Sequence, residues 1–134
     1  YKRQANVLAC AAGNYVLDNI SSNNFLNDVN KSGNYLLKGL KELKTRHPII
    51  GYLDNCGLYT GVELVRDRKT KEPADLEANY VRDLCVQNGL LFEKGGYYHN
   101  RLQLIPPLNI ELKVIDKCIE ILDVVFEKTR KKFK

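Results

Sequence analysis

Two polar side chains, Arg101 and Gln103, lie in the stretch NRLQLIPPL at residues 100–108. The spacing predicts a β-strand over 101–105, and the Pro-Pro pair that follows ends it because proline lacks the N–H that strand pairing needs. Side chains alternate between the two faces of a strand, so Arg101 and Gln103 share one face and the neighbouring leucines the other. We expect the leucines to face the core. The opposite face carries a guanidinium and an amide, which are groups that bind carboxylates and other polar ligands.

Histidines and cysteines, which often serve as bases, nucleophiles or metal ligands, are few and scattered. The histidines are His47 and His99. His47 precedes Pro48, where a helix is expected to end, and it is predicted to be a cation that caps this helix rather than a catalyst. The cysteines form no CxxC pair and are predicted to be small core residues in a reducing compartment. They are Cys10, Cys56, Cys85 and Cys118.

The charge pattern argues against a nucleic-acid-binding domain. The chain has 21 basic and 16 acidic residues, and five of the basic ones lie at 128–134. Without this stretch the charges balance, so it is predicted to be a solvated basic tail at a helix end. No apolar run reaches the ~20 residues needed to span a bilayer, and the start of the chain has no signal-peptide pattern. These features predict a cytoplasmic protein with no nucleic-acid or membrane partner.

The apolar patterns predict an α+β domain, in which helices cover a small, largely antiparallel sheet. The expected order is α-α-β-β-α-β-β-α. Helices are predicted at 6–20, 24–46, 75–88 and 111–130, and strands at 49–53, 58–65, 90–92 and 101–105. Residues 54–57 are predicted to connect the first two strands, and Gly33 to allow another backbone to approach closely.

Apolar stripes predict which faces of the last two helices are buried. The inward residues are expected to be Leu76, Tyr80, Leu84 and Cys85 in the third helix and Leu112, Ile115, Ile119, Leu122 and Phe126 in the last.

Five fragments, in order along the chain, resemble the class III aminotransferases, which are pyridoxal-phosphate enzymes of the aspartate aminotransferase fold type. ANVLACAAGNYVLD resembles the helix G-N-P-L-A-C-A-A of the family, and NYLLKGLKELKTRHPIIG its long helix and the segment leading to the sheet. CGLYTGVELVRDRKTKEPA resembles G-L-x-x-G-V/I-E-L-V-x-D followed by T-K-E-P-A. NGLLF and NRLQLIPPLNIELKVID resemble the ending G-L-L…N-V-L/I-R-L/I-x-P-P-L…I-D. The resemblance implies the C-terminal small domain of a fold type I transferase.

The resemblance also implies where the chemistry lies. In the family, the Schiff-base lysine and the aspartate that pairs with the pyridine nitrogen belong to the large domain, so no catalytic residue is expected on this chain. Residues 1–4 do not match and are predicted to be an N-terminal remnant. The small domain is then 5–127, with a junction helix at 5–23, and the tail is 128–134. Such a fragment is expected to be inactive alone, while its full-length parent binds pyridoxal phosphate and forms a homodimer.

The chain departs from the family pattern at three positions, of which one concerns the substrate. Val7 replaces a proline at the first helix, and Asp54 replaces the arginine of an R-G-x-G turn, which reverses a charge. Gln103 occupies the position of the arginine that binds the substrate carboxylate in the family. Loss of that arginine is expected to cost about 1–3 kcal/mol of binding if nothing compensates. Arg101 lies about 6–7 Å along the same face; it either reaches into the same space or pairs with a nearby acid.

The sequence therefore predicts the small domain of an aminotransferase that moves an amino group from an amine or ω-amino acid to a 2-oxo acid. Gln103 and Arg101 are the predicted substrate-binding residues. Two alternatives stay open. One is a phospho-lyase, racemase or aminomutase of the same superfamily, and the other is a non-catalytic α+β interaction domain with a basic tail.

Overall fold

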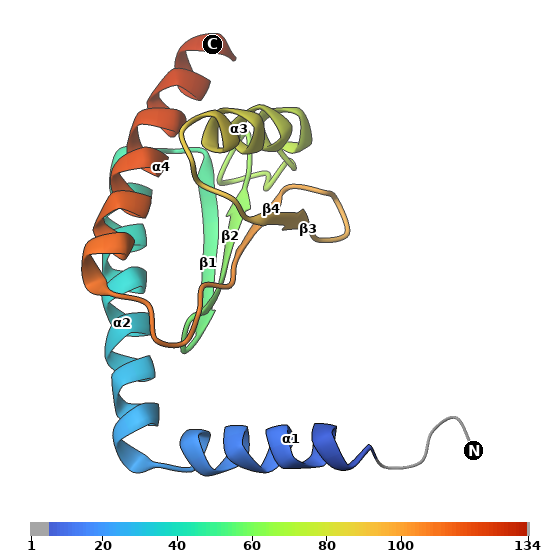
Figure 1. Ribbon diagram of the computed structural model, residues 1–134. Helices are drawn as coiled ribbons and strands as arrows, with labels where there is room; N and C mark the ends of the chain where they lie inside the picture. Colours follow the sequence, from blue (N-terminus) through green and yellow to red (C-terminus); the bar gives the residue numbers. More distant parts are fainter. Residues whose placement is uncertain (1–5, 134) are drawn as a thin grey trace.

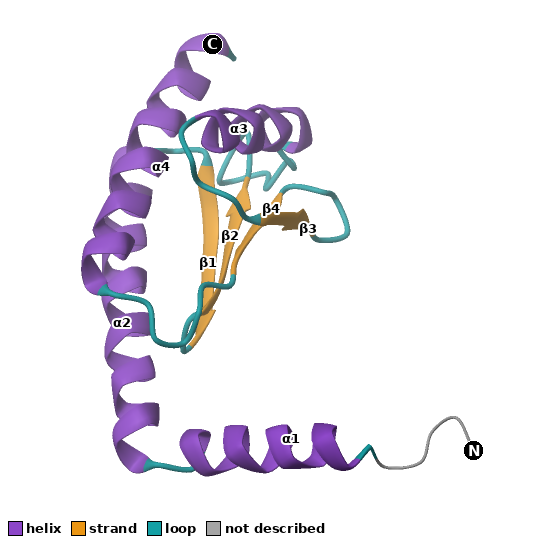
Figure 2. Ribbon diagram, viewed as in Figure 1, coloured by secondary structure: helices purple, strands orange, loops and turns teal. Residues whose placement is uncertain are grey.

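The computed structural model describes residues 6–133, which form four helices and four strands (Figure 1). The helices are α1 (Val7–Ile20), α2 (Asn23–Arg46), α3 (Asp75–Gln87) and α4 (Leu112–Lys132), and the strands are β1 (Ile50–Cys56), β2 (Tyr59–Leu64), β3 (Glu93–Gly95) and β4 (Arg101–Leu104). The strands form one antiparallel sheet in the order β1-β2-β4-β3 (Figure 2). The predicted α+β class is confirmed. The predicted remnant at residues 1–4 lies outside the described residues.

The core lies between one face of the sheet and the helices. α2 and α4 lie side by side against this face, and α3 lies across one end of the sheet (Figure 1). Val62, Leu64 and Leu102 of the strands are fully buried in one cluster with Leu40 of α2 and Phe126 of α4. Within residues 6–133, no helix covers the other face of the sheet.

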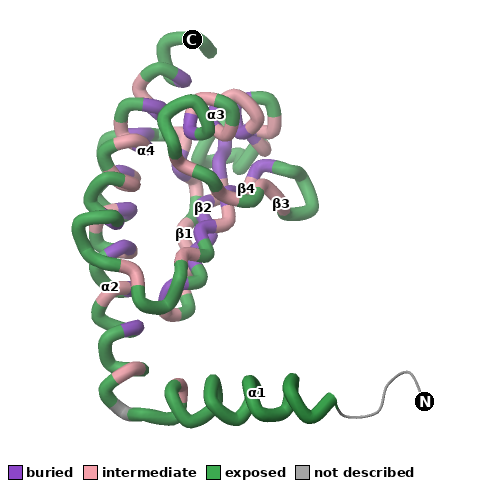
Figure 3. Tube along the Cα trace, viewed as in Figure 1, coloured by how far each residue is buried: buried purple, intermediate pink, exposed green. Residues whose placement is uncertain are grey.

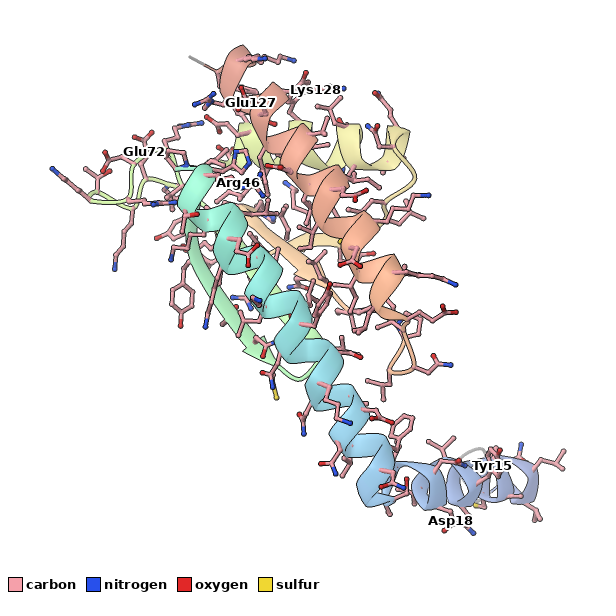
Figure 4. All side chains as sticks on the ribbon, turned by 90° about the vertical axis from the view of Figure 1, so that its left-hand side faces the viewer. Tyr15, Asp18, Arg46, Glu72, Glu127 and Lys128 are labelled. Carbon is pink, nitrogen blue, oxygen red and sulfur yellow. The ribbon has the colours of Figure 1, made fainter. Side chains whose placement is uncertain are left out.

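Helix α1 stands apart from this body (Figure 3). None of its residues is buried, and Val7 and Leu8 at its start are each 80% exposed. The side chain of Asn6 caps it by accepting a hydrogen bond from the backbone N–H of Leu8 at 3.0 Å. Figure 4 shows Tyr15 and Asp18 of this helix far from the labelled residues near the ends of α2 and α4. A largely apolar helix without a covered face is typical of a segment that packs against further protein.

Helix α2 has a side-chain cap at its start and packs closely against the β1–β2 hairpin. Ser22 accepts a hydrogen bond from the backbone N–H of Phe25 at 3.3 Å, so it serves as the N-cap. A Cβ atom at Gly33 would overlap the backbone carbonyl of Gly57. The predicted close approach of a second backbone at Gly33 is confirmed, and any larger residue there would push the β1–β2 hairpin away from α2.

The end of α2 differs from the prediction for His47. Its imidazole is buried, and Nε2 lies 2.6 Å from Oδ1 of Asp123 in α4. The carbonyl groups at the helix end accept hydrogen bonds from Arg68 instead, including that of His47 at 2.9 Å. His47 is the C-cap residue, as predicted, and its backbone N–H donates to the carbonyl of Leu43, but its side chain contacts Asp123 rather than the helix end. The side-chain donor to the helix end is the guanidinium of Arg68 in the polar 66–74 connector, whose contact no local pattern reveals.

The β1–β2 hairpin is tighter than predicted. Asp54 and Cys56 belong to β1, opposite Gly61 and Tyr59, so residues 54–57 are not a connecting segment. The turn falls at Gly57, whose φ of +60° favours glycine. Asp and Asn have low strand propensity, but pairing along the whole hairpin outweighs it.

The buried face of α3 is rotated from the predicted one. Leu76 is 58% exposed, whereas Glu77 and Val81 are buried. The charge of Glu77 is tolerated because Arg66 donates a hydrogen bond from Nε to its Oε1 at 2.8 Å. In α4, Ile115, Leu122 and Phe126 are buried as expected, but Leu112 in the first turn is 47% exposed.

Strand β3 and the exposed cysteines also differ from expectation. The third strand is Glu93–Gly95 rather than 90–92, because residues 90–92 lie in the loop after α3 and Leu91 is 77% exposed. Cys85 is buried, as predicted for a core residue, and Cys118 is half-buried. Cys10 and Cys56 are exposed, so the core prediction is wrong for these two.

The basic stretch 128–132 is helical, because α4 continues to Lys132. Lys132 lies over the ring of Tyr80 in α3, with Nζ 3.9 Å from the ring centroid, and Arg130 pairs with Glu127 at 2.8 Å. Part of this charge is therefore used in contacts within the domain. None of the described helices is both long and apolar enough to cross a membrane.

Candidate functional site

The candidate site is the uncovered face of the sheet, which we call the open sheet face. The strand register places ten residues on it: Tyr52, Asp54 and Cys56 of β1, Tyr59, Gly61 and Glu63 of β2, Glu93 and Gly95 of β3, and Arg101 and Gln103 of β4. Leu102 and Leu104 lie on the covered face and are 0% and 5% exposed. The predicted division of β4 into an apolar and a polar face is therefore present in the fold.

Arg101 is bound to Asp54 of β1 across the intervening strand β2. Its Nη2 donates a hydrogen bond to Asp54 Oδ2 at 2.7 Å, and its side chain is 23% exposed. The guanidinium lies over Gly61, where a Cβ atom would overlap both it and the Asp54 carboxylate. The hydrogen bond to Asp54 raises the pKa of Arg101. Of the alternatives left by the sequence, the structure has the pairing of Arg101 with a nearby acid.

Gln103 leans in the opposite direction, toward β3. Its Nε2 lies 3.0 Å from where a Cβ atom of Gly95 would be, and Glu93 is its direct neighbour in the register. Gln103 also lines a groove of about 810 Å³ between the β3–β4 edge and the first half of α4, together with apolar residues such as Phe92 and Ile110. The Arg101 guanidinium lies over Gly61, which is the register partner of Gln103 on β2, so Arg101 occupies the space on the β2 side of Gln103.

Charge on the open sheet face is predominantly negative. The carboxylates of Asp54, Glu63 and Glu93 share it with a single cation, Arg101, among the described residues. Glu63 lies directly opposite Arg101 and adds to the negative field around it. Position 103, which holds an arginine in the family pattern, contributes a neutral amide.

Sequence reasoning missed Asp54 and Gly61 as parts of this site. Asp54 was placed in a turn, and Gly61 had no assigned role beyond its motif. A signal was available, because Asp54 departs from the family pattern by a charge reversal and Arg101 supplies the opposite charge on a nearby strand. Recognising it requires the register of three strands, since the two residues are 47 positions apart.

Asp123, Cys85 and Cys118 are the ionisable groups away from the open sheet face whose pKa burial acts to raise most clearly. Burial acts to raise the pKa of Asp123, but hydrogen bonds from His47 and Arg46 outweigh it and lower this pKa. Burial raises the pKa of Cys85 to about 12 and that of Cys118 to about 11, so both stay protonated and are poor nucleophiles at neutral pH. Residues 6–133 contain no group of three His, Cys, Asp or Glu side chains arranged to hold a metal ion.

Comparison with known proteins gives the family. The sequence model of the family described as Aminotransferase class-III matches residues 4–126. The chain is 37% identical over 123 residues to alanine–glyoxylate aminotransferase 2 homolog 2, mitochondrial, of Arabidopsis thaliana, covering 92% of this chain and 26% of that protein. It is 38% identical over 119 residues to taurine–pyruvate aminotransferase of Bilophila wadsworthia, covering 85% and 26%.

Solved structures agree. A Bacillus anthracis aminotransferase superimposes with a TM-score of 0.82 at 35% identity, covering 90% of this chain and 28% of that one. An amine transaminase from an uncultivated Pseudomonas species, in its pyridoxal-phosphate-bound internal aldimine form, gives a TM-score of 0.80 at 27% identity, covering 90% and 27%. The chain spans about a quarter of the length of these relatives. Its sequence and fold both place it in one family, and the chain belongs to the class III aminotransferases.

Proposed function

We propose that this chain is the C-terminal small domain, residues 5–127 with a basic tail at 128–134, of a pyridoxal-phosphate-dependent aminotransferase. The complete protein would transfer an amino group from an amine or ω-amino acid to a 2-oxo acid. The observation that carries the proposal is the ordered match over residues 4–126, together with a fold that superimposes on solved transaminases.

The described residues do not by themselves fit a pyridoxal phosphate site. A Schiff base needs a lysine amine in the site, yet the register directs Lys94 of β3 toward the covered face, opposite Leu102. The other described lysines lie outside the strands that form the open sheet face. The cofactor is therefore assigned to the complete protein, and the isolated chain is expected to be inactive.

The role proposed for this domain is to supply a substrate-facing wall. The open sheet face supports this role, because it carries polar side chains and no helix of residues 6–133 covers it. Arg101 and Gln103 are the proposed substrate-facing residues on β4. Helix α1, exposed on all sides, supports packing of this chain against further protein within the 5–23 junction segment.

The remaining parts of the proposal concern assembly and location. We expect the complete protein to be a cytoplasmic homodimer, with an amino donor and a 2-oxo acid as its small-molecule partners and no nucleic-acid or membrane partner. The relative from Arabidopsis thaliana carries a mitochondrial designation, so location must be determined for the complete protein by fractionation.

Expression of the complete protein tests the proposal. It is expected to be yellow, with the visible absorbance of a Schiff base between pyridoxal phosphate and a lysine, and to convert a 2-oxo acid into its amino acid when an amine is supplied. The 134-residue chain, prepared in parallel, is expected to show neither property. A complete protein without bound pyridoxal phosphate would overturn the proposal. Bound cofactor without amino transfer would favour a lyase, racemase or aminomutase.

A further inference from the structure

We propose that the apolar groove between the β3–β4 edge and the first half of α4 is the docking site of a segment of the same polypeptide that precedes residue 1 of this chain. The segment would fill the groove and add its apolar side chains to the core of the domain. This inference rests on one part of the proposed function, that the chain is the C-terminal domain of a longer protein, and is independent of the reaction that this protein catalyses.

The floor of the groove belongs to the hydrophobic core. The groove has a volume of about 810 Å³, and Leu90, Phe92 and Ile110 are among the residues that line it. These three side chains are partly buried and pack against the core cluster that contains Leu102 and Phe126. Apolar groups placed over this floor would therefore extend an existing core.

The rim of the groove exposes large apolar side chains. Leu91 is 77% exposed, Ile105 60% and Val114 47%, and all three line the groove. Single exposed apolar residues are ordinary on a protein surface, whereas a contiguous apolar patch marks a place where another molecule or segment binds. Floor and rim together form such a patch.

The polar groups of the groove favour a polypeptide over a small molecule. Small-molecule sites combine apolar walls with a few placed polar groups that orient the ligand. The charged side chains here, Glu93 and Lys117, are exposed. Among the described residues, the buried side-chain atoms that lack a hydrogen-bond partner are Nδ1 of His47 and Oδ1 of Asp54, and neither residue lines the groove. Glu93 and Lys117 instead complement an apolar segment that carries a basic and an acidic residue beside its apolar face.

The length of the relatives points to the source of this segment. The chain spans about a quarter of their length, so most of such a polypeptide lies outside it. A segment tethered to this domain meets the groove at an effective concentration on the order of millimolar. It also avoids the loss of translational and rotational freedom that a second molecule would incur on binding. A segment of the same polypeptide is therefore favoured over a second copy.

Two valines of α4 provide a matched test in the complete protein. Val114 lines the groove and is 47% exposed in this domain, whereas Val124 is 51% exposed and lies outside the groove. Val114→Gln places a polar side chain against the docked segment and is expected to lower the melting temperature by about 2 °C or more. Val124→Gln is expected to leave it within about 1 °C of wild type. Equal melting temperatures for the two variants would overturn the inference.

Photo-cross-linking in the complete protein identifies what lies in the groove. Benzoylphenylalanine, a photo-reactive amino acid, replaces Ile105 at the rim or, as the control, Val124. At position 105 we expect a cross-link to a peptide that precedes residue 1, within a polypeptide of unchanged mass on a denaturing gel, and at position 124 no cross-link to that peptide. A product of twice that mass would place a second copy in the groove. Cross-links confined to residues 1–134 or to a small molecule would show that no preceding segment lies there, and each of these results would overturn the inference.

The two tests keep this inference separate from the proposed function. An empty groove in a protein that binds pyridoxal phosphate and transaminates would leave the proposed function intact. A complete protein without bound pyridoxal phosphate would overturn the proposed function, whatever occupies the groove.

Discussion

The two faces of strand β4 are built by different rules. Leu102 and Leu104 enter a core shared with α2 and α4, where any apolar neighbour of suitable volume contributes to packing. On the other face, Arg101 is oriented by Asp54 of β1 and by the space over Gly61, and Gln103 by the space over Gly95. Packing on the covered face thus depends on the volume of the side chains, whereas side-chain orientation on the open sheet face depends on how the charges are paired. Substitutions of the two leucines should change mainly stability, and those of Arg101 and Gln103 mainly specificity.

The largest expected effect is on the covered face. Leu102→Ala removes a fully buried side chain and should lower the free energy of unfolding by about 2–5 kcal/mol, because it leaves a cavity that the strands cannot fill. Urea denaturation of the complete protein measures this loss. Gln103→Ala, one residue away on the open sheet face, is the matched control and should stay within about 0.5 kcal/mol of wild type. Similar losses for both would contradict the division between the faces.

The contact between His47, at the end of α2, and Asp123 of α4 should make a smaller, pH-dependent contribution to the free energy of unfolding. Asp123→Asn weakens the contact with the buried His47 and should cost about 1–3 kcal/mol at neutral pH. The pKa of Asp123 is lowered in the folded state, so its contribution is present above the unfolded pKa of about 3.9 and is lost as the pH falls below it. Unfolding measured across this range should show the wild type converging on the variant in acid. A constant difference down to pH ~2 would argue that the carboxylate charge is irrelevant.

The glycine beneath the ion pair provides a third test. Gly61→Ala places a methyl group where Arg101 and Asp54 now meet and should destabilise the protein by about 1–3 kcal/mol through overpacking. Arg101→Gln relieves that clash, so the double variant should recover part of the loss. Equal melting temperatures for Gly61→Ala and wild type would show that the pair does not depend on this space.

The difference between the faces also explains which buried residues and contacts could be predicted from the sequence. Alternation along 101–105 was enough to assign Leu102 and Leu104 to the core, and the apolar stripe of α4 located Ile115, Leu122 and Phe126. The same reasoning failed where burial or capping depends on a charged residue elsewhere in the chain. Glu77 is buried because Arg66 binds it, and the carbonyl groups at the end of α2 are bound by Arg68. These contacts depend on tertiary position rather than on local spacing.

The candidate site shows the same limit. Departures from the family pattern marked position 103 and, separately, Asp54. The meeting of Asp54 with Arg101 over Gly61, beside Gln103, follows from side-chain directions across three strands. Those directions depend on the space left over Gly61 and Gly95. A glycine in the sequence does not show which side chain occupies that space until the strand register is known.

The central claim, that the open sheet face of β4 is a substrate-facing wall, is tested most directly by Gln103→Arg in the complete holoenzyme. The measurement is the ratio of kcat/KM for an α-amino acid to that for the matched amine, with the melting temperature recorded alongside. A guanidinium at position 103 is expected to raise this ratio at least about tenfold, because it adds a charged contact to the carboxylate where the wild type has an amide. An unchanged ratio in a stably folded variant would contradict the claim that this face meets the substrate.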